Sequence, residues 1–275
     1  MRKTTGAIVC PKCERLIAAQ EKNCPYCGAW RPGMFGFGPA IHRALGGGLD
    51  LSNIITVTCS VLYVLSLAID PRALLHITGI FDLLSPSGES LFRLGMTGGY
   101  AIALGQWWTL CTAVFLHGSL LHILFNMVIM RRYLPMVADL FGNVRAFVIF
   151  MAAGIAGYVL SNALGGHNTI GASGAVFGLL GALVSYGRRT GQSQVTGQLW
   201  MSALMMFAMS FMMGGSVNNW AHAGGFGGGF LAAQLMPTTN RREGPTMLVL
   251  AGALAFVTVA GFVLSFLGFA PAMIH

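Results

Sequence analysis

Two residue types that combine in nucleophilic catalysis, a serine and a histidine, stand in strongly apolar parts of this sequence. Ser173 lies in the run Gly-Ala-Ser-Gly, and His222 lies in the run Ala-His-Ala-Gly-Gly. A reactive serine needs a base to take its proton, and a carboxylate usually orients that base. No Asp or Glu occurs between Phe141 and Arg242. The pair is therefore either two ordinary packing residues or a two-residue catalyst that works inside a bilayer.

The composition identifies the medium in which these residues must work. Of the 275 residues, 55% are hydrophobic and only 9% are charged, whereas soluble domains carry about 25% charged residues. Several apolar runs approach the roughly 20 residues that a helix needs to span a bilayer. The net charge of +8 would suggest a nucleic-acid or acidic partner in a soluble protein, but in a membrane protein it first reflects topology. We expect an all-α polytopic membrane protein with no nucleic-acid partner.

Seven helical spans account for the apolar runs and must position the two residues. They are Leu51–Ile69, Ser119–Leu140, Val144–Leu164, Ser173–Gly187, Gly197–Met213, Trp220–Met236 and Thr246–Phe269. With alternating crossings, fourteen Lys and Arg residues fall on the side of the N-terminus and two, Arg72 and Arg93, on the opposite side. Because loops rich in Lys and Arg stay in the cytoplasm, we expect a cytoplasmic N-terminus and a C-terminus outside.

The connection from Asp70 to Trp108 is too long for a plain turn and is rich in Leu, Phe, Trp and Gly. We expect a folded loop that lies partly in the membrane interface, which is a favourable position for Trp107 and Trp108.

Counting along the spans places the serine and the histidine at the same depth. Ser173 lies fifteen residues before Arg188, and His222 lies fifteen residues before Pro237. At about 1.5 Å per residue, both lie about 22 Å from the cytoplasmic boundary of a hydrocarbon core about 30 Å thick. Two neighbouring helices could therefore bring the side chains together.

Glycines flank the serine and follow the histidine, in the second case at the four-residue spacing of one helix face: Gly171, Gly174, Gly225 and Gly229. Small residues let helix backbones approach closely. Packing alone explains these glycines, but close packing is also what would bring a short serine side chain within reach of an imidazole.

The span that begins at Ser119 carries two more polar groups. His122 and Asn126 are four residues apart and so share one helix face. Two uncharged donors could stabilise a developing oxyanion, or they could make only structural hydrogen bonds. His117 lies roughly 140° around the helix from His122, and we expect it to fix the loop that enters the span.

Together these motifs closely resemble the rhomboid family of intramembrane serine proteases. Residues 171–174 resemble its Gly-x-Ser-x motif, and residues 221–229 resemble its Ala-His-x-x-Gly-x-x-x-Gly motif. Residues 117–126, His-Gly-Ser-Leu-Leu-His followed by Asn, resemble its first helix motif. The resemblance covers about Leu51 to Phe269 and implies a rhomboid-like core of six helices, to which this chain adds a seventh, C-terminal transmembrane helix.

The resemblance also implies an activity, that of a serine endopeptidase that cuts transmembrane segments without a cofactor. Ser173 would be the nucleophile, and His222 would act first as general base and then as general acid. The Ser173 N–H, His122 and Asn126 would form the oxyanion hole. The residues that would line or support the substrate groove are Gly171, Gly174, Phe177, His117, Gly225 and Gly229. Substrates would be cut near the outer interface, at a small residue, after local unwinding.

Two positions depart from the family pattern. Thr109 follows Trp108 where arginine is usual, and Phe177 stands where well-studied members have a tyrosine that packs on the imidazole. Phenylalanine keeps the stacking and loses only the hydroxyl.

Two other functions stay open. The chain could be an inactive relative that binds or escorts client transmembrane segments, against which the intact Ser–His pair argues. It could also be a metal-responsive transporter, against which the absence of charged residues from the spans of Ser173 and His222 argues.

The N-terminal region carries a separate motif, two Cys-x-x-Cys pairs separated by ten residues: Cys10, Cys13, Cys24 and Cys27. The spacing suits one tetrahedral, structural Zn²⁺ and resembles a zinc ribbon. Two disulfides are the alternative, but the cytoplasm keeps thiols reduced. Because so short a module has no adequate apolar core, the metal would supply its folding free energy.

The expected organisation has three parts: a zinc-ribbon-like module at 1–33, a Gly-rich linker at 34–50 and a rhomboid-like transmembrane protease domain at 51–270. We expect a multi-pass protein of a bacterial inner membrane, in contact with lipid and with transmembrane protein substrates. The cytoplasmic module would regulate the protease or bind a partner.

Overall fold

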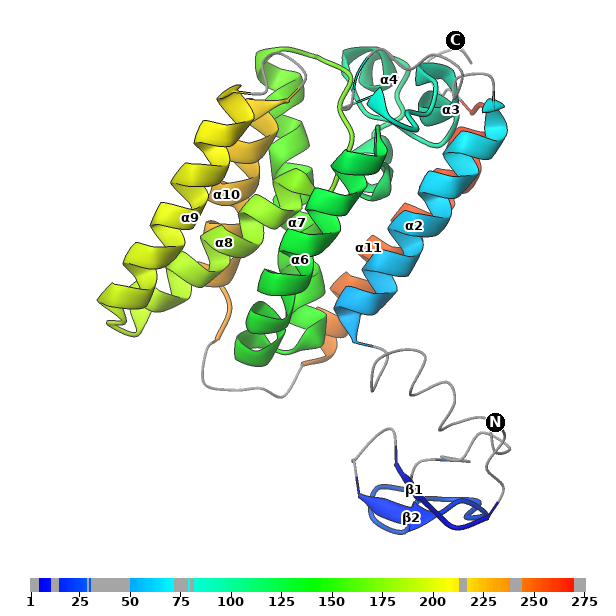
Figure 1. Ribbon diagram of the computed structural model, residues 1–275, viewed down its shortest axis with the longest axis vertical. Coiled ribbons are helices and arrows are strands. Elements are labelled where there is room, and N and C mark those ends of the chain that lie inside the picture. Colours follow the sequence, from blue (N-terminus) through cyan, green and yellow to red (C-terminus); the bar gives the residue numbers. More distant parts are fainter. Residues whose placement is uncertain are drawn as a thin grey trace. The chain divides into compact units, whose positions relative to one another are not determined.

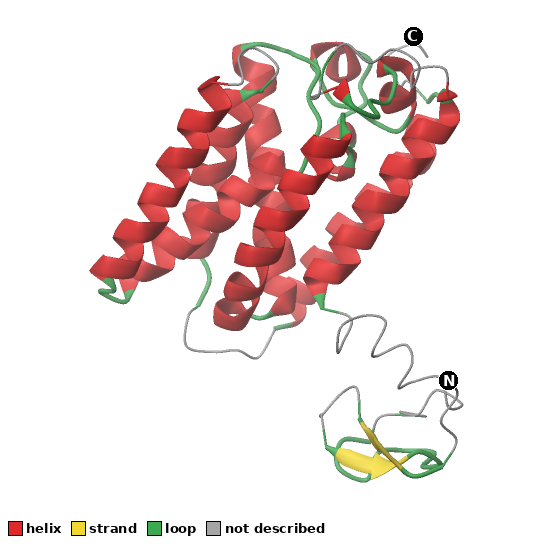
Figure 2. Ribbon diagram, in the orientation of Figure 1, coloured by secondary structure: helices red, strands yellow, loops and turns green. Residues whose placement is uncertain are grey.

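The computed structural model describes residues 5–10, 15–28, 30, 50–71, 79, 82–212, 217–237 and 244–269. The chain divides into two compact units, Met1–Ile54 and Ile55–His275. Among the described residues, the strands belong to the first unit, and the second unit is helical (Figure 2).

The N-terminal unit contains a two-stranded antiparallel sheet. β1 (Ala7–Val9) pairs with β2 (Leu16–Ala18). In both strands only the middle residue is buried, as expected where alternate side chains point to opposite faces. The small buried core consists of two paired isoleucines and two cysteines: Ile8, Ile17, Cys10 and Cys24. The apolar core of this unit is thus built around thiols.

Helices lie at all seven predicted spans of the chain (Figure 1). They are α2 (Leu51–Ile69), α6 (Leu120–Phe141), α7 (Asn143–Leu164), α8 (Ser173–Arg189), α9 (Ser193–Met212), α10 (Asn219–Gln234) and α11 (Pro245–Phe266). The ends differ from the predicted ones by a few residues, most at the start of α9. Gly142 separates α6 from α7 with φ of 91°, a left-handed conformation that suits glycine.

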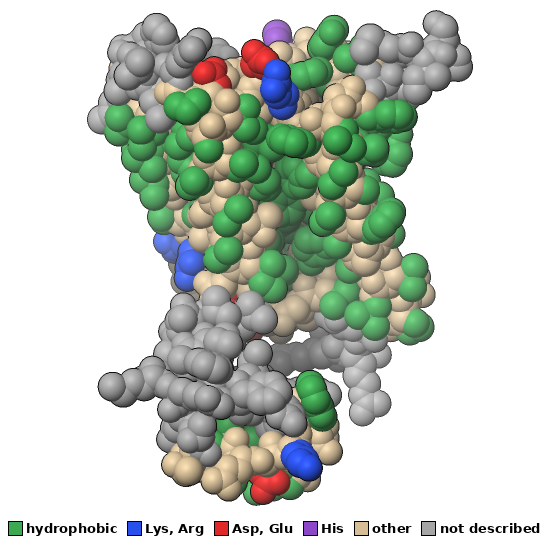
Figure 3. All heavy atoms as spheres, turned by 90° about the vertical axis from the view of Figure 1, so that its right-hand side faces the viewer, with side chains coloured by type: hydrophobic (Ala, Val, Ile, Leu, Met, Phe, Trp, Pro, Cys, Tyr) green, Lys and Arg blue, Asp and Glu red, His purple; other side chains and the backbone are tan. Residues whose placement is uncertain are grey.

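Five of these helices, among the residues that the structure describes, are long and apolar enough to cross a membrane: α2, α6, α7, α9 and α11. Figure 3 shows hydrophobic side chains over much of the visible face of the helical unit, while its Lys, Arg, Asp and Glu side chains lie near the ends. So large an exposed apolar surface is unfavourable in water and suits lipid. The chain is an integral, multi-pass membrane protein.

The other two helices, α8 and α10, are shorter. They contain 17 and 16 residues, which corresponds to about 26 Å and 24 Å of helix, less than the roughly 30 Å hydrocarbon core. At one end, Arg189 of α8 donates to the carbonyl oxygens of Ala233 and Met236 at 2.8 and 3.0 Å, which fixes the C-terminal ends of both helices at one level. Because the two helices are of nearly equal length, their N-terminal ends, where Ser173 and His222 are found, also lie at similar levels.

The connection between α2 and α6 is folded, as expected from its composition. It contains α3 (Gly88–Arg93), α4 (Gly99–Ala103), α5 (Thr109–Thr112) and the 3₁₀ turn η4 (Ala113–Phe115). Figure 1 shows α3 and α4 together at one end of the helix bundle.

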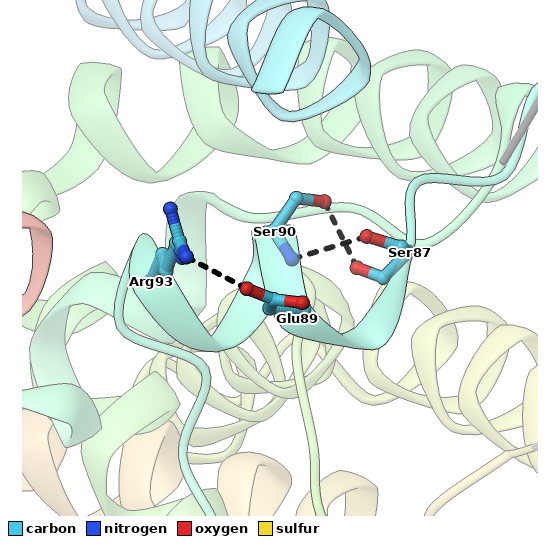
Figure 4. A network of polar contacts seen from close by, with 4 residues as sticks. All are labelled: Ser87, Glu89, Ser90 and Arg93. Carbon is cyan, nitrogen blue, oxygen red and sulfur yellow. Dashed lines mark hydrogen bonds and ion pairs between the residues drawn. The ribbon is translucent and has the colours of Figure 1, made fainter. Parts of the chain in front are cut away.

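Helix α3 is stabilised by its own polar side chains (Figure 4). The N-cap Ser87 accepts a hydrogen bond from the backbone N–H of Ser90 at 3.2 Å, as is usual for serine at this position. Glu89 and Arg93, four residues apart, form an ion pair at 2.7 Å. These local contacts let six residues hold a helical turn that would be unstable alone.

The two tryptophans of this connection have different environments. Trp107 is 59% exposed, but Trp108 is only 3% exposed. Trp108 Nε1 donates to Ser265 Oγ of α11 at 2.9 Å. Trp108 is therefore held by protein contacts, and of the two tryptophans only Trp107 is exposed enough to contact lipid. Small residues of α11 make room for it, since a Cβ at Gly261 would stand 3.0 Å from the indole.

Thr109, which stands where the family pattern has arginine, takes part in the internal bonding of the connection. Its hydroxyl donates to the carbonyl oxygen of Gln106 at 2.7 Å and lies 3.2 Å from Thr97 Oγ1. Asn162 of α7 donates to the same Thr97 oxygen at 3.4 Å. The hydroxyls of Thr109 and Thr97 therefore link the connection to Asn162 of α7 without an arginine.

Candidate active site

Ser173 and His222 meet where α8 and α10 begin. Ser173 is the first residue of α8, and His222 lies in the first turn of α10. His222 Nε2 lies 2.9 Å from Ser173 Oγ, a hydrogen-bond distance. The imidazole is buried, with 5% of the residue exposed. A hydroxyl and the base that could take its proton are thus in contact inside the helix bundle.

Glycines allow this contact because they let α8 and α10 touch backbone to backbone. A Cβ at Gly225 would overlap the carbonyl oxygen of Gly174, and a Cβ at Gly229 would overlap that of Gly178. A Cβ at Gly174 would in turn stand 3.1 Å from the carbonyl oxygen of Ala221. Three of the glycines singled out in the sequence therefore lie in one helix interface, which brings the start of α10 close to Ser173.

A second glycine face places α10 against α7. A Cβ at Gly224 would stand 2.9 Å from the carbonyl oxygen of Ala156, and a Cβ at Gly157 would overlap the carbonyl oxygen of Ala221. Helix α10 therefore lies between α7 and α8 with hardly any side-chain volume on either side. Its position is fixed by backbone contacts.

Aromatic rings hold the imidazole of His222. The ring of Phe177 stacks on it with centroids 4.4 Å apart and an interplanar angle of 24°. Phe207 of α9 meets its edge at 6.2 Å and 76°. His222 Nδ1 is buried without a hydrogen-bond partner in the part of the chain that the structure describes. Packing takes the place of an orienting carboxylate.

Phe207 did not stand out in the sequence. It lies in a methionine-rich run of α9 in which any apolar residue could face lipid or protein, so no local pattern distinguishes it.

His122, in the first turn of α6, faces the turn that leads into α8. The Gly118 N–H donates to its Nδ1 at 3.3 Å, which assigns the proton of the neutral ring to Nε2. A Cβ at Gly171 would stand only 2.6 Å from that Nε2, and Gly171 has φ of 116°. Because Gly171 has no side chain, the Nε2–H of His122 can lie beside it. Gly171 is two residues before Ser173 in the chain.

Asn126 is buried one turn further along α6. Its Nδ2 donates to the carbonyl oxygen of His122 at 2.9 Å. An amide carries two N–H donors, so one remains for another acceptor.

His117 lies between η4 and α6 and is fully buried. Its ring meets the ring of His122 at 5.1 Å and 66°. Together with the hydrogen bond from the Gly118 N–H, this ring contact holds the His122 side chain against the loop that leads into α6. His117 therefore supports His122. Among the described residues its ring makes no hydrogen bond with Ser173.

Tyr158 of α7 is a further contact that the sequence analysis missed. Its hydroxyl lies 2.6 Å from the carbonyl oxygen of Gly171 and 3.1 Å from that of Ala113. The Gly171 N–H also donates to Ala113 at 2.9 Å. A buried tyrosine needs a partner for its hydroxyl. The single tyrosine in this apolar span could therefore have indicated a buried hydrogen bond. Here it fixes the peptide that precedes Ser173.

The N-terminal unit brings together three of the four cysteines expected to bind zinc. The sulfur atoms of Cys10, Cys24 and Cys27 all lie within 4.8 Å of one another, and Cys10 Sγ lies 3.7 Å from Cys27 Sγ. A tetrahedral ion with Zn–S bonds of about 2.3 Å requires sulfurs about 3.8 Å apart. All three thiols are free, and Cys13 lies outside the described residues. The donor set fits zinc.

The electrostatics of Cys24 favour the form that binds a metal. Removal from water raises the pKa of this thiol, but hydrogen bonds from the backbone of Tyr26 and Cys27 and from the thiols of Cys27 and Cys10 outweigh it and lower the pKa to about 7. The thiolate is the metal ligand. Gly28, with φ of 69°, completes the tight turn around the pair Cys24–Cys27.

Comparison with known proteins agrees with this architecture. Residues 104–238 match the model of the rhomboid domain. Rhomboid protease GluP of Bacillus subtilis is 32% identical over 152 residues, which cover 54% of this chain and 30% of GluP. RHOMBOID-like protein 7 of Arabidopsis thaliana is 32% identical over 205 residues, 66% of this chain and 65% of that protein. The chain thus spans less than two thirds of either relative.

YdcA of Bacillus subtilis, whose name assigns it provisionally to the rhomboid proteases, is covered more fully. It is 31% identical over 184 residues, which make up 62% of this chain and 88% of YdcA. The domain match ends between α10 and α11, so α11 follows the matched domain. With its helix bundle, its Ser–His contact and these relatives, the chain belongs to the rhomboid family.

Proposed function

We propose that this protein is an intramembrane serine endopeptidase that hydrolyses peptide bonds in or near transmembrane segments of other proteins. The observation that carries the proposal is the 2.9 Å contact between Ser173 Oγ and His222 Nε2 within an apolar helix bundle. Ser173 is the nucleophile and His222 is its base. GluP is named as a rhomboid protease and YdcA provisionally so, which supports the same reaction.

In the first step Ser173 Oγ attacks the carbonyl carbon of the substrate, and its proton moves to His222 Nε2. The resulting oxyanion accepts hydrogen bonds from the Ser173 N–H, from His122 Nε2–H and from the Asn126 amide. His222 then gives its proton to the leaving amine, the C–N bond breaks and an acyl-enzyme remains on Ser173. Water, deprotonated by His222, releases the acyl group and restores the hydroxyl.

The position of Ser173 at the N-terminus of α8 favours this chemistry. The first N–H groups of a helix have no partner within it, and the helix dipole is positive at this end. Both features stabilise negative charge on an oxyanion. Gly171 leaves room for His122 Nε2 near this N–H, so we take Gly171 to border the substrate groove. Gly174 supports the groove by its contact with α10.

The substrate class follows from the location of the pair inside an apolar bundle. A peptide bond in a helix has its carbonyl engaged and its backbone covered by side chains. A substrate segment must therefore unwind locally before Ser173 can reach it, and helix breakers near the cut favour cleavage. The reaction itself requires no cofactor.

The charge distribution supports a cytoplasmic N-terminus and a C-terminus outside, with the Ser–His pair in the outer half of a bacterial inner membrane. The proposed organisation is a zinc-ribbon-like module at 1–33, a linker at 34–50 and the protease domain at 51–270. Zn²⁺ would be held by Cys10, Cys13, Cys24 and Cys27 and would stabilise the module. The module would then bind a cytoplasmic partner or regulate the protease.

The decisive experiment compares wild type with Ser173→Ala and His222→Ala, each reconstituted in proteoliposomes with a reporter transmembrane substrate. Both variants are expected to lose cleavage. Ser185→Ala is the matched control, because Ser185 is buried on the same helix and its Oγ has no partner among the described residues. Cleavage by both variants at the wild-type rate would sink the proposal.

A serine-directed fluorophosphonate probe separates an active protease from a relative that only binds or escorts clients. The probe is expected to label wild type at Ser173 and to leave Ser173→Ala unlabelled. Folded wild type that binds the reporter segment, fails to cleave it and takes no label would favour the escort.

A further inference from the structure

A single amide side chain joins the segments that carry the two reacting residues. Asn218 precedes His222 by four residues, and Thr169 precedes Ser173 by four residues. Asn218 Nδ2 donates to Thr169 Oγ1 at 2.8 Å and also to Ser161 Oγ of α7. The amide therefore contacts the turn before α8, the start of α10 and the end of α7.

The same side chain is the N-cap of α10. Its Oδ1 accepts the Ala221 N–H at 3.1 Å, and the backbone carbonyl oxygen of Asn218 accepts the His222 N–H at 3.3 Å. Because a backbone N–H needs an acceptor, Oδ1 must face Ala221, which leaves both protons of Nδ2 for the two hydroxyls. The first turn of α10, and with it His222, is thus fixed relative to Asn218.

The partners of Asn218 are themselves held firmly. Ser161 is 1% exposed and Thr169 is 9% exposed. The Thr169 hydroxyl donates to the His167 carbonyl oxygen at 2.8 Å, and the Thr169 N–H donates to the Thr97 carbonyl oxygen at 2.8 Å. The Thr169 Oγ1 is therefore free to accept the hydrogen bond from Asn218 Nδ2. In a buried site of this kind hydrogen bonds are costly to break, so the junction is rigid.

We propose that Asn218 is a positioning residue that sets the separation between Ser173 and His222. In a Ser–His–Asp triad a carboxylate aligns the base through Nδ1. Here Nδ1 of His222 has no such partner in the described chain, and stacking on Phe177 fixes the plane of the ring without fixing its position along α10. The junction of Asn218 with Thr169 and Ser161 fixes that position through the backbone. The inference rests on the proposed protease activity.

The test separates the junction from helix capping. Asn218→Ser keeps an N-cap side chain that suits a helix but is too short to reach Thr169 and Ser161. Thr169→Val keeps the shape of threonine and removes the hydroxyl, and Thr169→Ser restores the hydroxyl. Cleavage of a reporter transmembrane segment in proteoliposomes gives kcat and KM for each, and thermal unfolding checks the fold.

Asn218→Ser and Thr169→Val are expected to lower kcat about tenfold or more, with KM changed less than about twofold, because the groove is intact and only the alignment suffers. Thr169→Ser is expected to recover most of kcat. The double variant Asn218→Ser/Thr169→Val is expected to be no slower than the slower single variant, since both changes break one junction.

Two negative results are distinguishable. If wild type does not cleave, or if Ser173→Ala cleaves equally well, the proposed function fails and the inference fails with it. If wild type cleaves, Ser173→Ala does not, and Thr169→Val matches Thr169→Ser in kcat, only the inference is overturned. The threonine pair gives this answer even if Asn218→Ser does not fold.

Discussion

The imidazole of His222 lies flat against the ring of Phe177, with centroids 4.4 Å apart and planes inclined by 24°. In the proposed mechanism the imidazole must stay aligned while it gains and loses a proton. Stacking restricts its rotation, and a ring face also tolerates the positive charge of the protonated form.

Phe177→Ala is therefore expected to lower kcat more than tenfold and to destabilise the fold by about 3–5 kcal/mol through the cavity that it leaves. Phe177→Tyr keeps the ring face and is expected to retain most of kcat. Phe150→Ala is the control, because Phe150 is equally buried in α7 but does not stack on His222. Steady-state cleavage and thermal unfolding measure both effects. An equal loss of kcat in the two alanine variants would mean that the stacking has no special role.

Gly225→Ala tests the backbone contact between α8 and α10. The added methyl group would overlap the carbonyl oxygen of Gly174, so α10 must move away from Ser173. We expect a loss of stability of about 3 kcal/mol or more and loss of cleavage. Gly227→Ala on the same helix meets no atom within 4 Å and should gain about 1 kcal/mol from helix propensity. The melting temperatures of Gly225→Ala and Gly227→Ala test this difference. Similar values for the two variants would exclude close packing at Gly225.

His122→Ala removes one proposed donor to the oxyanion. Loss of one such donor typically lowers kcat by about 10²–10³-fold, and KM is expected to change little because the donor acts mainly in the transition state. His167→Ala removes an exposed histidine from the turn between α7 and α8 and should leave kcat unchanged. Rates measured with the reporter substrate check both variants. A His122→Ala enzyme with wild-type kcat would remove His122 from the oxyanion hole.

The N-terminal unit is expected to contain about one Zn²⁺ per chain. Metal analysis of the purified full-length protein measures this, and Cys24→Ser is expected to lower the zinc content strongly. Because the metal supplies the folding free energy of the unit, a chelator should open it to trypsin at Arg15 and Lys22. Cys111→Ser, far along the chain in α5, is the control and should keep its zinc. Equal zinc in Cys24→Ser and wild type would contradict the proposed ligand set.

Leu84 has φ of 53°, the one positive value at a residue other than glycine among the described residues. Tyr63 donates to its carbonyl oxygen at 2.5 Å and helps to hold this strained conformation, which costs on the order of 1 kcal/mol. Leu84→Gly and Leu84→Ala both remove the side chain beyond Cβ, but only glycine also removes the Cβ and with it the strain. Leu84→Gly is therefore expected to be the more stable variant by about 1 kcal/mol, the reverse of the usual order. Melting temperatures of the two variants test the sign.

Much of the fold could be predicted from the sequence because its signals are local. The apolar runs marked the helices, and the glycine spacing indicated which faces of α8 and α10 would meet. The contact between Ser173 and His222 followed from matched depth and from motifs that resemble the rhomboid family.

Contacts between distant segments had no comparable signal. Phe207 reaches His222 from a methionine-rich run in which no pattern distinguishes one apolar residue from another. Nothing near Trp108 in the sequence indicated its partner Ser265. Asn218, the N-cap of α10, was not singled out in the sequence, and its two hydroxyl partners lie 49 and 57 residues away. Such pairings depend on how the helices cross, which periodicity does not encode.

The bonds between the α2–α6 connection and the last helix have a consequence for synthesis. Trp108 and Ser265 are 157 residues apart, and Gln106 reaches the carbonyl oxygen of Phe269 across 163 residues. A ribosome therefore finishes α6, α8 and α10 well before either bond can form. Until α11 enters the membrane, the indole N–H of Trp108 lacks its serine acceptor. The connection beside Ser173 thus gains its final contacts last, after every residue of the proposed reaction has already been inserted.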